Sequence, residues 1–204
     1  MSLNTPQQIS ARGERLGESH LTALEHWRRG LIANARRVPH FDPSDGGDEA
    51  RLLVLLETPG PGTAPMRFVS RDNPTGTARN LAMFLDDAGV SRAGMVLWNT
   101  VPWIVHEPGA RNRAARRAEI AEGLQLLPGF LELLPQLSVI LLAGRVAAQA
   151  VPVIARVRSE VAIVTIPHPS PTYVCTNPDV AQRIRDGMQK VATLLDSSSM
   201  NRSI

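Results

Sequence analysis

Leu52-Leu53-Val54-Leu55-Leu56-Glu57-Thr58-Pro59-Gly60-Pro61-Gly62 is the stretch of this sequence that decides the fold. Its five aliphatic residues in succession, closed by a carboxylate and by prolines and glycines, are typical of a strand buried on both faces. In an open α/β sheet, ligands bind beyond the carboxyl ends of such strands. We therefore expect Glu57 and the loop after it at a ligand-binding edge.

Strands and helices alternate along the chain on either side of this stretch. Short apolar runs predict further strands at 95–98, 139–142 and 161–166. Helical spacing of apolar residues predicts helices, at 18–37, 77–88, 113–127, 145–155 and 179–195. This alternation implies crossover connections, and we predict an α/β protein with three α/β/α layers and a four-stranded parallel central sheet.

A chain of 204 residues is expected to form a single domain. Polar, aperiodic sequence predicts loose arms at 1–15 and 197–204. Between them we expect an N-terminal helix and loop at 16–50 and the α/β core at 51–196.

Composition narrows the class of protein. The apolar fraction is 43% and the net charge is only +3, yet arginines cluster at 28–37 and 111–117. Such patches suit a polyanion partner, although either patch alone is better interpreted as a solvated helix face. Cys175 is the only cysteine, so no disulfide framework or cysteine-bound metal site is expected. No signal peptide or membrane-spanning run is present, and we expect a cytoplasmic protein without membrane contact.

Polar side chains follow three of the four predicted strands. Glu57 comes directly after the first strand, Asn99 after the second and His168 after the fourth. The carboxyl ends of parallel strands face the same side, so we expect these residues in one cleft. The loop after the first strand adds Phe68 and Asp72. Each residue alone also fits a structural role, and their shared location favours a functional one.

These side chains together form a chemically coherent set. An amide can read a pyrimidine edge, and an aromatic ring can stack on a planar base. An imidazole can donate to a developing oxyanion, and a carboxylate can orient water or stabilise a cation. This combination is what cleavage of a base from its sugar requires.

The sequence resembles the uracil-DNA glycosylase superfamily from about Leu52 to Tyr173. Glu57-Thr58-Pro59-Gly60 resembles the first motif of the bacterial and archaeal iron–sulfur branch, and Phe68 resembles the phenylalanine that stacks on uracil. Asn99-Thr100-Val101-Pro102-Trp103 resembles the segment whose asparagine reads the uracil edge, and His168-Pro169-Ser170 matches the second motif. The segments 108–113 and 139–150 resemble further parts of that branch.

The sequence departs from the family pattern at the residues that bind the cofactor, position the water and select the base. With Cys175 alone, the chain should lack the iron–sulfur cluster, and we expect no cofactor and no metal. The best-known branch has Gln-Asp-Pro-Tyr in its first motif, where Asp positions water and Tyr excludes the thymine methyl. Thr58 and Gly60 stand at those positions here. Glu57 and Asp72 are the alternative water-positioning carboxylates, and the sequence does not choose between them.

The resemblance implies a monomeric enzyme that flips uracil out of single- or double-stranded DNA and hydrolyses its N-glycosidic bond. It implies that His168, with Glu57 or Asp72, is catalytic, and that Phe68 and Asn99 bind the base in a pocket lined by Thr58, Pro59 and Gly60. The implied DNA-binding residues are Ser170, Thr172, Tyr173, Arg111 and Arg113. A glycosylase for hypoxanthine, xanthine or mismatched thymine, a non-catalytic binder of uracil or abasic DNA, and an unrelated α/β hydrolase are the alternatives.

Overall fold

A four-stranded parallel sheet forms the centre of the protein. The computed structural model describes residues 2–32, 36–61, 64–107 and 113–200. The strand order is β4-β2-β5-β6, all parallel, which confirms the predicted sheet. The strands are β2 (Leu52–Leu56), β4 (Met95–Asn99), β5 (Val139–Ala143) and β6 (Ala162–Ile166).

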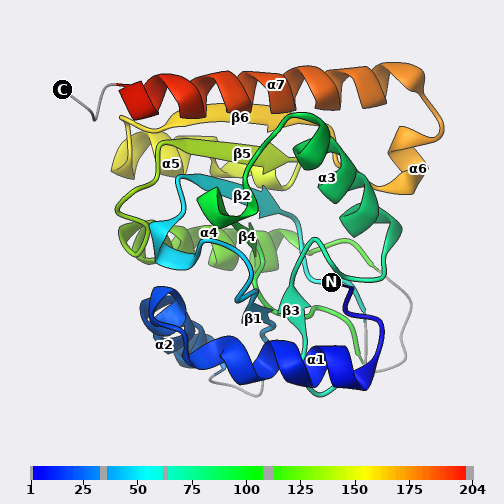
Figure 1. Ribbon diagram of the computed structural model, residues 1–204, viewed down its shortest axis with the longest axis vertical. Coiled ribbons are helices and arrows are strands. Elements are labelled where there is room, and N and C mark those ends of the chain that lie inside the picture. The colour runs from blue at the N-terminus through cyan, green and yellow to red at the C-terminus, as the bar shows by residue number, and fades with distance from the viewer. Residues whose placement is uncertain (1, 33–35, 62–63, 108–112, 201–204) are drawn as a thin grey trace.

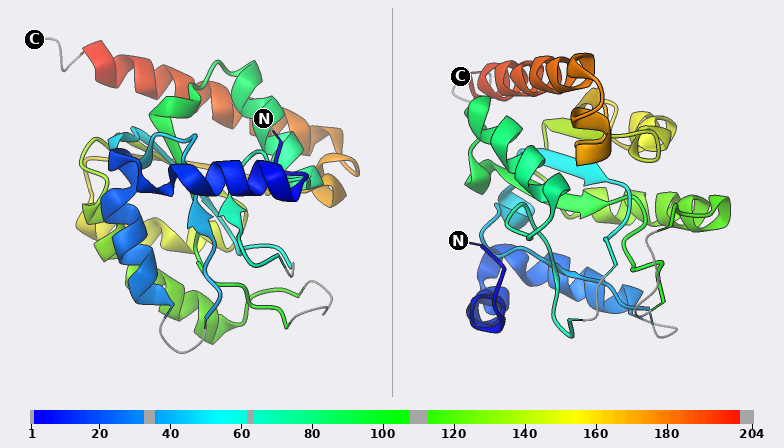
Figure 2. Two further views of the ribbon diagram at one scale, coloured as in Figure 1. Left: turned by 60° about the horizontal axis from the view of Figure 1, so that its bottom comes forward. Right: turned by 90° about the vertical axis from the view of Figure 1, so that its right-hand side faces the viewer.

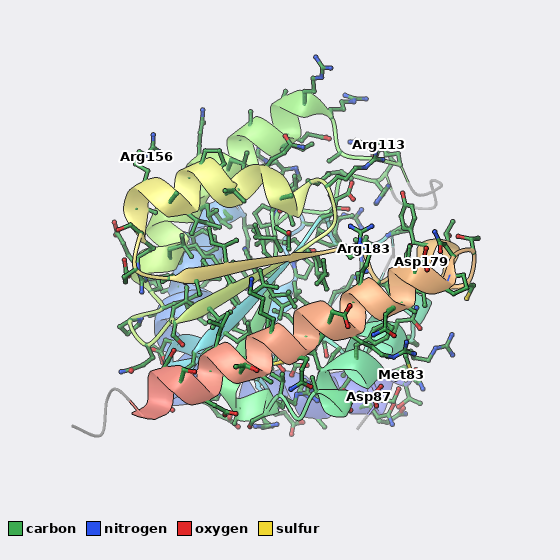
Figure 3. The ribbon with its side chains drawn as sticks, turned by 90° about the horizontal axis from the view of Figure 1, so that it is seen from above. Met83, Asp87, Arg113, Arg156, Asp179 and Arg183 are labelled. Carbon is green, nitrogen blue, oxygen red and sulfur yellow. The ribbon has the colours of Figure 1, made fainter. Side chains whose placement is uncertain are left out.

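Helices cover both faces of this sheet, which confirms the α/β/α layering (Figure 1). On one side, α7 (Pro178–Met200) packs on β6 and β5, and α3 (Gly76–Asp87) lies beside it. On the other, α4 (Arg117–Glu132) lies beside α5 (Val151–Val157). Viewed from above, β6 runs between α5 and α7 (Figure 3).

Burial explains why the strands form where apolar runs occur. Leu52 to Leu55 and the whole of β5 are buried, so continuous apolar sequence is what these positions require. All the parallel crossovers place the helix N-termini at the carboxyl edge of the sheet, seen from that side in Figure 2 (right). The segments that contain Glu57, Asn99 and His168 lie at this edge.

A second, two-stranded parallel sheet was not predicted. It pairs β1 (His40–Phe41) with β3 (Phe68–Val69), in register His40 to Phe68. Phe41 stacks on Trp98 of β4 at a centroid distance of 3.8 Å, and α2 (Thr22–Leu31) contributes Trp27 to the same aromatic cluster. This packing holds the small sheet against the carboxyl end of β4. Strands of two residues are too short to produce a sequence pattern.

The prediction of a loose arm at 1–15 was wrong. Residues 6–13 form α1 (Pro6–Gly13), which starts with a capping box between Thr5 and Gln8 and a proline in its first turn. The helix has almost no apolar face, and buried Arg12 holds it by ion pairs to Asp42 and Asp72. Because those partners are distant in sequence, periodicity could not reveal the helix.

Several helix boundaries also differ from the predictions. Within the predicted helix 18–37, the described residues form one short 3₁₀ turn (Ser19–Leu21) followed by α2, and α4 continues through Pro128 instead of stopping there. At the C-terminus, α7 extends to Met200 through the predicted tail, and 201–204 lie outside the described residues. Among the described helices, none is both long and apolar enough to cross a membrane.

Candidate active site

The ends of β2 and β4 bring Glu57 and Asn99 to adjacent strands. Leu56 pairs in register with Asn99. The pairing continues past the strands, because Thr100 N donates to Leu56 O at 2.9 Å and Val101 N donates to Glu57 O at 3.0 Å. The first motif and the Asn99 segment are therefore held together by backbone hydrogen bonds, as expected from their positions after neighbouring strands.

His168 follows β6 at the same edge of the sheet and packs against the turn after β5. Gly144 has φ +98°, a conformation that L side chains rarely adopt, and a Cβ there would lie 3.0 Å from the Cβ of His168. Gly144 N donates to Ile166 O at 2.9 Å, which ties this turn to the end of β6. Burial lowers the pKa of His168, so its imidazole is neutral at neutral pH.

Helix α3 holds the loop that contains His168. Asn80 Nδ2 donates to Pro169 O at 2.9 Å. At the start of α3, a Cβ on Gly76 would lie 2.3 Å from Pro171 Cγ, so only glycine permits this approach. No sequence pattern predicts the role of Asn80, since a polar residue in a helix is normally solvated. Gly144, at a strand-to-helix turn, could have been noticed.

Phe68 is attached to this edge through its neighbours. Asn73 Nδ2 donates to Phe68 O at 2.9 Å, and the ring of Phe68 lies 5.8 Å from that of His40, next to Phe41 on Trp98. The strand that contains Phe68 therefore lies beside β4, the strand that ends in Asn99. Phe68 and Asn99 are both 4% exposed, and a base that contacts them must occupy a covered space.

The sheet spacing sets the width of the candidate site. Three strand spacings separate β4 from β6, and at about 4.8 Å each this places the two backbones about 14 Å apart.

The structure does not bring Asp72 to this edge. Its Oδ2 accepts from Arg12 at 2.9 Å and from Arg92 at 2.8 Å. Arg92 also pairs with Asp42 and Asp45, and it lies just before β4. The ion-pair cluster therefore lies toward the amino end of β4, the strand that ends in Asn99. Burial raises the pKa of Asp72, but the hydrogen bonds from both arginines outweigh it and lower the pKa. Asp72 thus lies in an ion-pair cluster with Arg12 and Arg92.

Glu57 is the remaining one of the two candidate carboxylates. It is partly exposed at the end of β2, in the backbone-paired segment beside Asn99. In the same motif Thr58 is partly exposed, Pro59 is buried and Gly60 is exposed.

The predicted DNA-binding residues fall into two groups. Ser170 precedes α6 (Pro171–Val174), on which Thr172 is exposed and Tyr173 is 49% exposed. Arg113 instead donates to both carboxylate oxygens of Glu119, at 2.6 and 2.8 Å, and these bonds lower the pKa of Glu119 to about 2. Arg111 lies outside the described residues.

No group of three His, Cys, Asp or Glu side chains within the described ranges is placed to hold a metal ion.

Comparison with known proteins gives one match to a family and matches to solved structures. Residues 43–187 match the family model described as the uracil DNA glycosylase superfamily. No curated protein matches the chain at a significant level. A crystal structure of a variant of mimivirus UNG in complex with UGI is 14% identical, with 82% of this chain and 70% of that chain covered and a TM-score of 0.40.

Proposed function

The chain belongs to the uracil-DNA glycosylase superfamily, and on that premise we propose that it hydrolyses the N-glycosidic bond of deoxyuridine in DNA. The products are free uracil and an abasic site. The observation that supports this most directly is the common strand edge of Glu57, Asn99 and His168.

The base is recognised in a flipped state. Flipping out of a duplex costs about a few kcal/mol, which stacking and hydrogen bonding in the pocket offset. In our proposal Phe68 stacks on the ring, and Asn99 pairs with O4 and N3 of uracil and thereby rejects cytosine. The 4% exposure of both side chains supports a site from which water is excluded once the base is bound.

Bond cleavage leaves an oxocarbenium-like sugar and an anionic uracil. His168 donates a hydrogen bond to uracil O2 as negative charge develops there. Its burial supports this role, because a neutral imidazole stabilises the anion as a hydrogen-bond donor and does not need to lose a proton. Gly144 and Asn80 hold the imidazole and its loop in place.

A carboxylate assists the attack of water on the sugar, and in our proposal Glu57 takes this role. It orients the water and stabilises the cationic sugar from the edge beside Asn99. The double ion pairing of Asp72 supports this choice between the two carboxylates.

A labelled oligonucleotide with a single uracil tests the proposal. We expect an alkali-labile abasic site at the uracil and none in a thymine control. His168→Ala should lower the single-turnover rate by about two to three decades, the effect of removing one oxyanion donor. An intact strand at high enzyme concentration would contradict the proposed activity.

A second candidate function follows from Gly60. Glycine at the methyl-gate position, exposed in this structure, does not exclude thymine by bulk. Oligonucleotides with mismatched thymine, hypoxanthine or xanthine, assayed beside uracil, distinguish a broader glycosylase. A gel-shift complex with uracil-DNA but without any abasic product would identify a binding protein.

A further inference from the structure

Two arginines lie between the loops that follow β2 and β4. Arg67, directly before β3, donates from Nη1 to Gly60 O at 2.8 Å. Arg37, before β1, donates from Nη2 to His106 O at 2.8 Å. Gly60 belongs to the first motif, and His106 lies on the loop after Asn99. The two guanidinium groups thus connect the small sheet to both sides of the candidate site.

The backbone brings these arginines close to one another. His40 N donates to Arg67 O at 2.7 Å, and Ile104 N donates to Arg37 O at 2.9 Å. Burial, and after it the charge of Arg37, lowers the pKa of Arg67. The two positive charges therefore repel each other in a partly dehydrated position.

Carboxylates neutralise other arginines around this site but not Arg67. Arg36 pairs with Glu122, Arg113 with Glu119, and Arg92 with Asp42 and Asp72. In the part of the chain that the structure describes, Arg67 forms no ion pair with a carboxylate. Its bond to Gly60 O satisfies one N–H but supplies no negative charge.

An anion would supply the negative charge that Arg67 does not receive from a carboxylate of the described residues. A guanidinium has five N–H donors in a planar fork that matches the oxygens of a phosphate. An anion that contacts both arginines would turn their repulsion into two attractions. A half-buried pair is screened less by salt than a fully solvated one.

We propose that Arg67 and Arg37 bind one phosphodiester group of the DNA strand next to the flipped nucleotide. The inference rests on the proposed glycosylase function, because a DNA strand must pass these loops to deliver a base to their strand ends. A neighbouring hollow of about 450 Å³, lined by Arg36, Trp103, His106 and Glu119, is large enough for the adjoining nucleotide. In the wall of this hollow, Arg36 Cζ lies over the ring of Trp103, 4.0 Å from its centroid.

Salt dependence of binding is the first test. The probe is an oligonucleotide with a 2′-fluorinated deoxyuridine that resists cleavage, and the dissociation constant is measured over a range of salt concentrations. Arg67→Gln should lower the slope of log Kd against log salt by about 1, and Arg67→Lys should retain it. Arg156→Gln is the matched control, since Arg156 is exposed on α5 at the end of the molecule away from Arg113 (Figure 3). Equal slopes for wild type, Arg67→Gln and Arg156→Gln would overturn the proposal.

A scan of the DNA backbone is the second test. Neutral methylphosphonates replace the phosphodiesters one at a time near the uracil analogue. At one linkage the neutral substitution should cost Arg67→Gln less affinity than it costs wild type, because the variant has already lost the Arg67 contact with that phosphate and only the Arg37 contact remains to be lost. Losses that add at every linkage would exclude a shared contact.

Uracil excision, assayed on the same proteins, separates the two proposals. Excision by wild type with additive losses at all linkages refutes the phosphate site and leaves the glycosylase intact. A non-additive linkage without any excision refutes the enzyme and retains the DNA contact. Thermal unfolding of each variant establishes that it is folded.

Discussion

Asn80 on α3 donates a hydrogen bond to the carbonyl oxygen of Pro169, 2.9 Å away, and so fixes the residue directly after His168. These two residues are 89 positions apart in the sequence. The bond makes the position of the imidazole depend on the helix on one face of the sheet. Displacement of a catalytic group by about 1 Å can cost about 10²-fold in rate.

We predict that Asn80→Ala lowers kcat for uracil release by about tenfold or more and leaves KM nearly unchanged, because the base-binding residues are untouched. Steady-state kinetics on the uracil oligonucleotide measure both constants. Arg79→Ala, at the exposed neighbouring position, is the control and should behave like wild type. A fall in the rate of both variants would point to the helix as a whole.

Gly144→Ala should both destabilise the protein and slow the reaction. Its φ of +98° strains any L residue by about 1–3 kcal/mol, and the new Cβ would press on His168. Gly89→Ala shares the positive φ, +70°, but its Cβ would meet nothing within 4 Å. Chemical denaturation should therefore show a lower unfolding free energy for both variants. Single-turnover kinetics should show a lower rate of uracil release for Gly144→Ala alone. Equal rates for Gly144→Ala and Gly89→Ala would mean that His168 accommodates the new Cβ without an effect on the reaction.

The two carboxylates should respond differently to neutralisation. Glu57→Gln should lower kcat by about 10²-fold with little change in stability, as expected when a water-positioning base is lost. Asp72→Asn should retain most of the activity but lose about 1–3 kcal/mol of unfolding free energy, because it weakens bonds to Arg12 and Arg92. Rate and denaturation midpoint are measured for both. The opposite result would reassign the catalytic carboxylate to Asp72.

The buried ion cluster predicts a pH-dependent stability. Burial, reinforced by the charge of Asp42, raises the pKa of Asp45 from 3.8 to about 8. Between these values the folded protein keeps a proton that the unfolded chain has released, so the Asp45 contribution to stability is present at low pH and is lost as the pH rises through this window.

In the wild-type protein Arg92 Nε donates to Asp45 Oδ1 at 2.9 Å. Asp45→Asn keeps an oxygen acceptor for this bond, but its side chain cannot ionise. Its unfolding free energy relative to wild type should increase from pH 5 to pH 9. Denaturant midpoints at several pH values measure this difference, and Asp87→Asn, on an exposed position, should show no trend. A constant difference for Asp45→Asn would show that Asp45 is ionised throughout.

Asn99→Asp should relax the discrimination between uracil and cytosine. A carboxylate cannot donate to uracil O4, but it accepts from the exocyclic amine of cytosine. Rates on matched uracil and cytosine oligonucleotides measure the ratio. An unchanged ratio would remove Asn99 from base recognition.

The sequence by itself determined the central sheet and the edge at which function is expected. Continuous apolar runs at 52–56 and 139–143 can be satisfied only by burial on both faces, and the polar residues that end the strands must then share one edge. Both properties are local in the chain, because burial pattern and strand ends are encoded by consecutive residues.

Only the tertiary structure decided what the individual polar residues do. Asp72 resembled a catalytic group until its bonds to Arg12 and Arg92 were seen, and α1 was hidden because its support is an ion pair and not an apolar face. The contacts of Asn80 and Arg67 could not be predicted from the sequence either. A charge or a hydrogen-bond donor acquires its role from the partner that folding brings to it, and no periodicity along the chain records that partner.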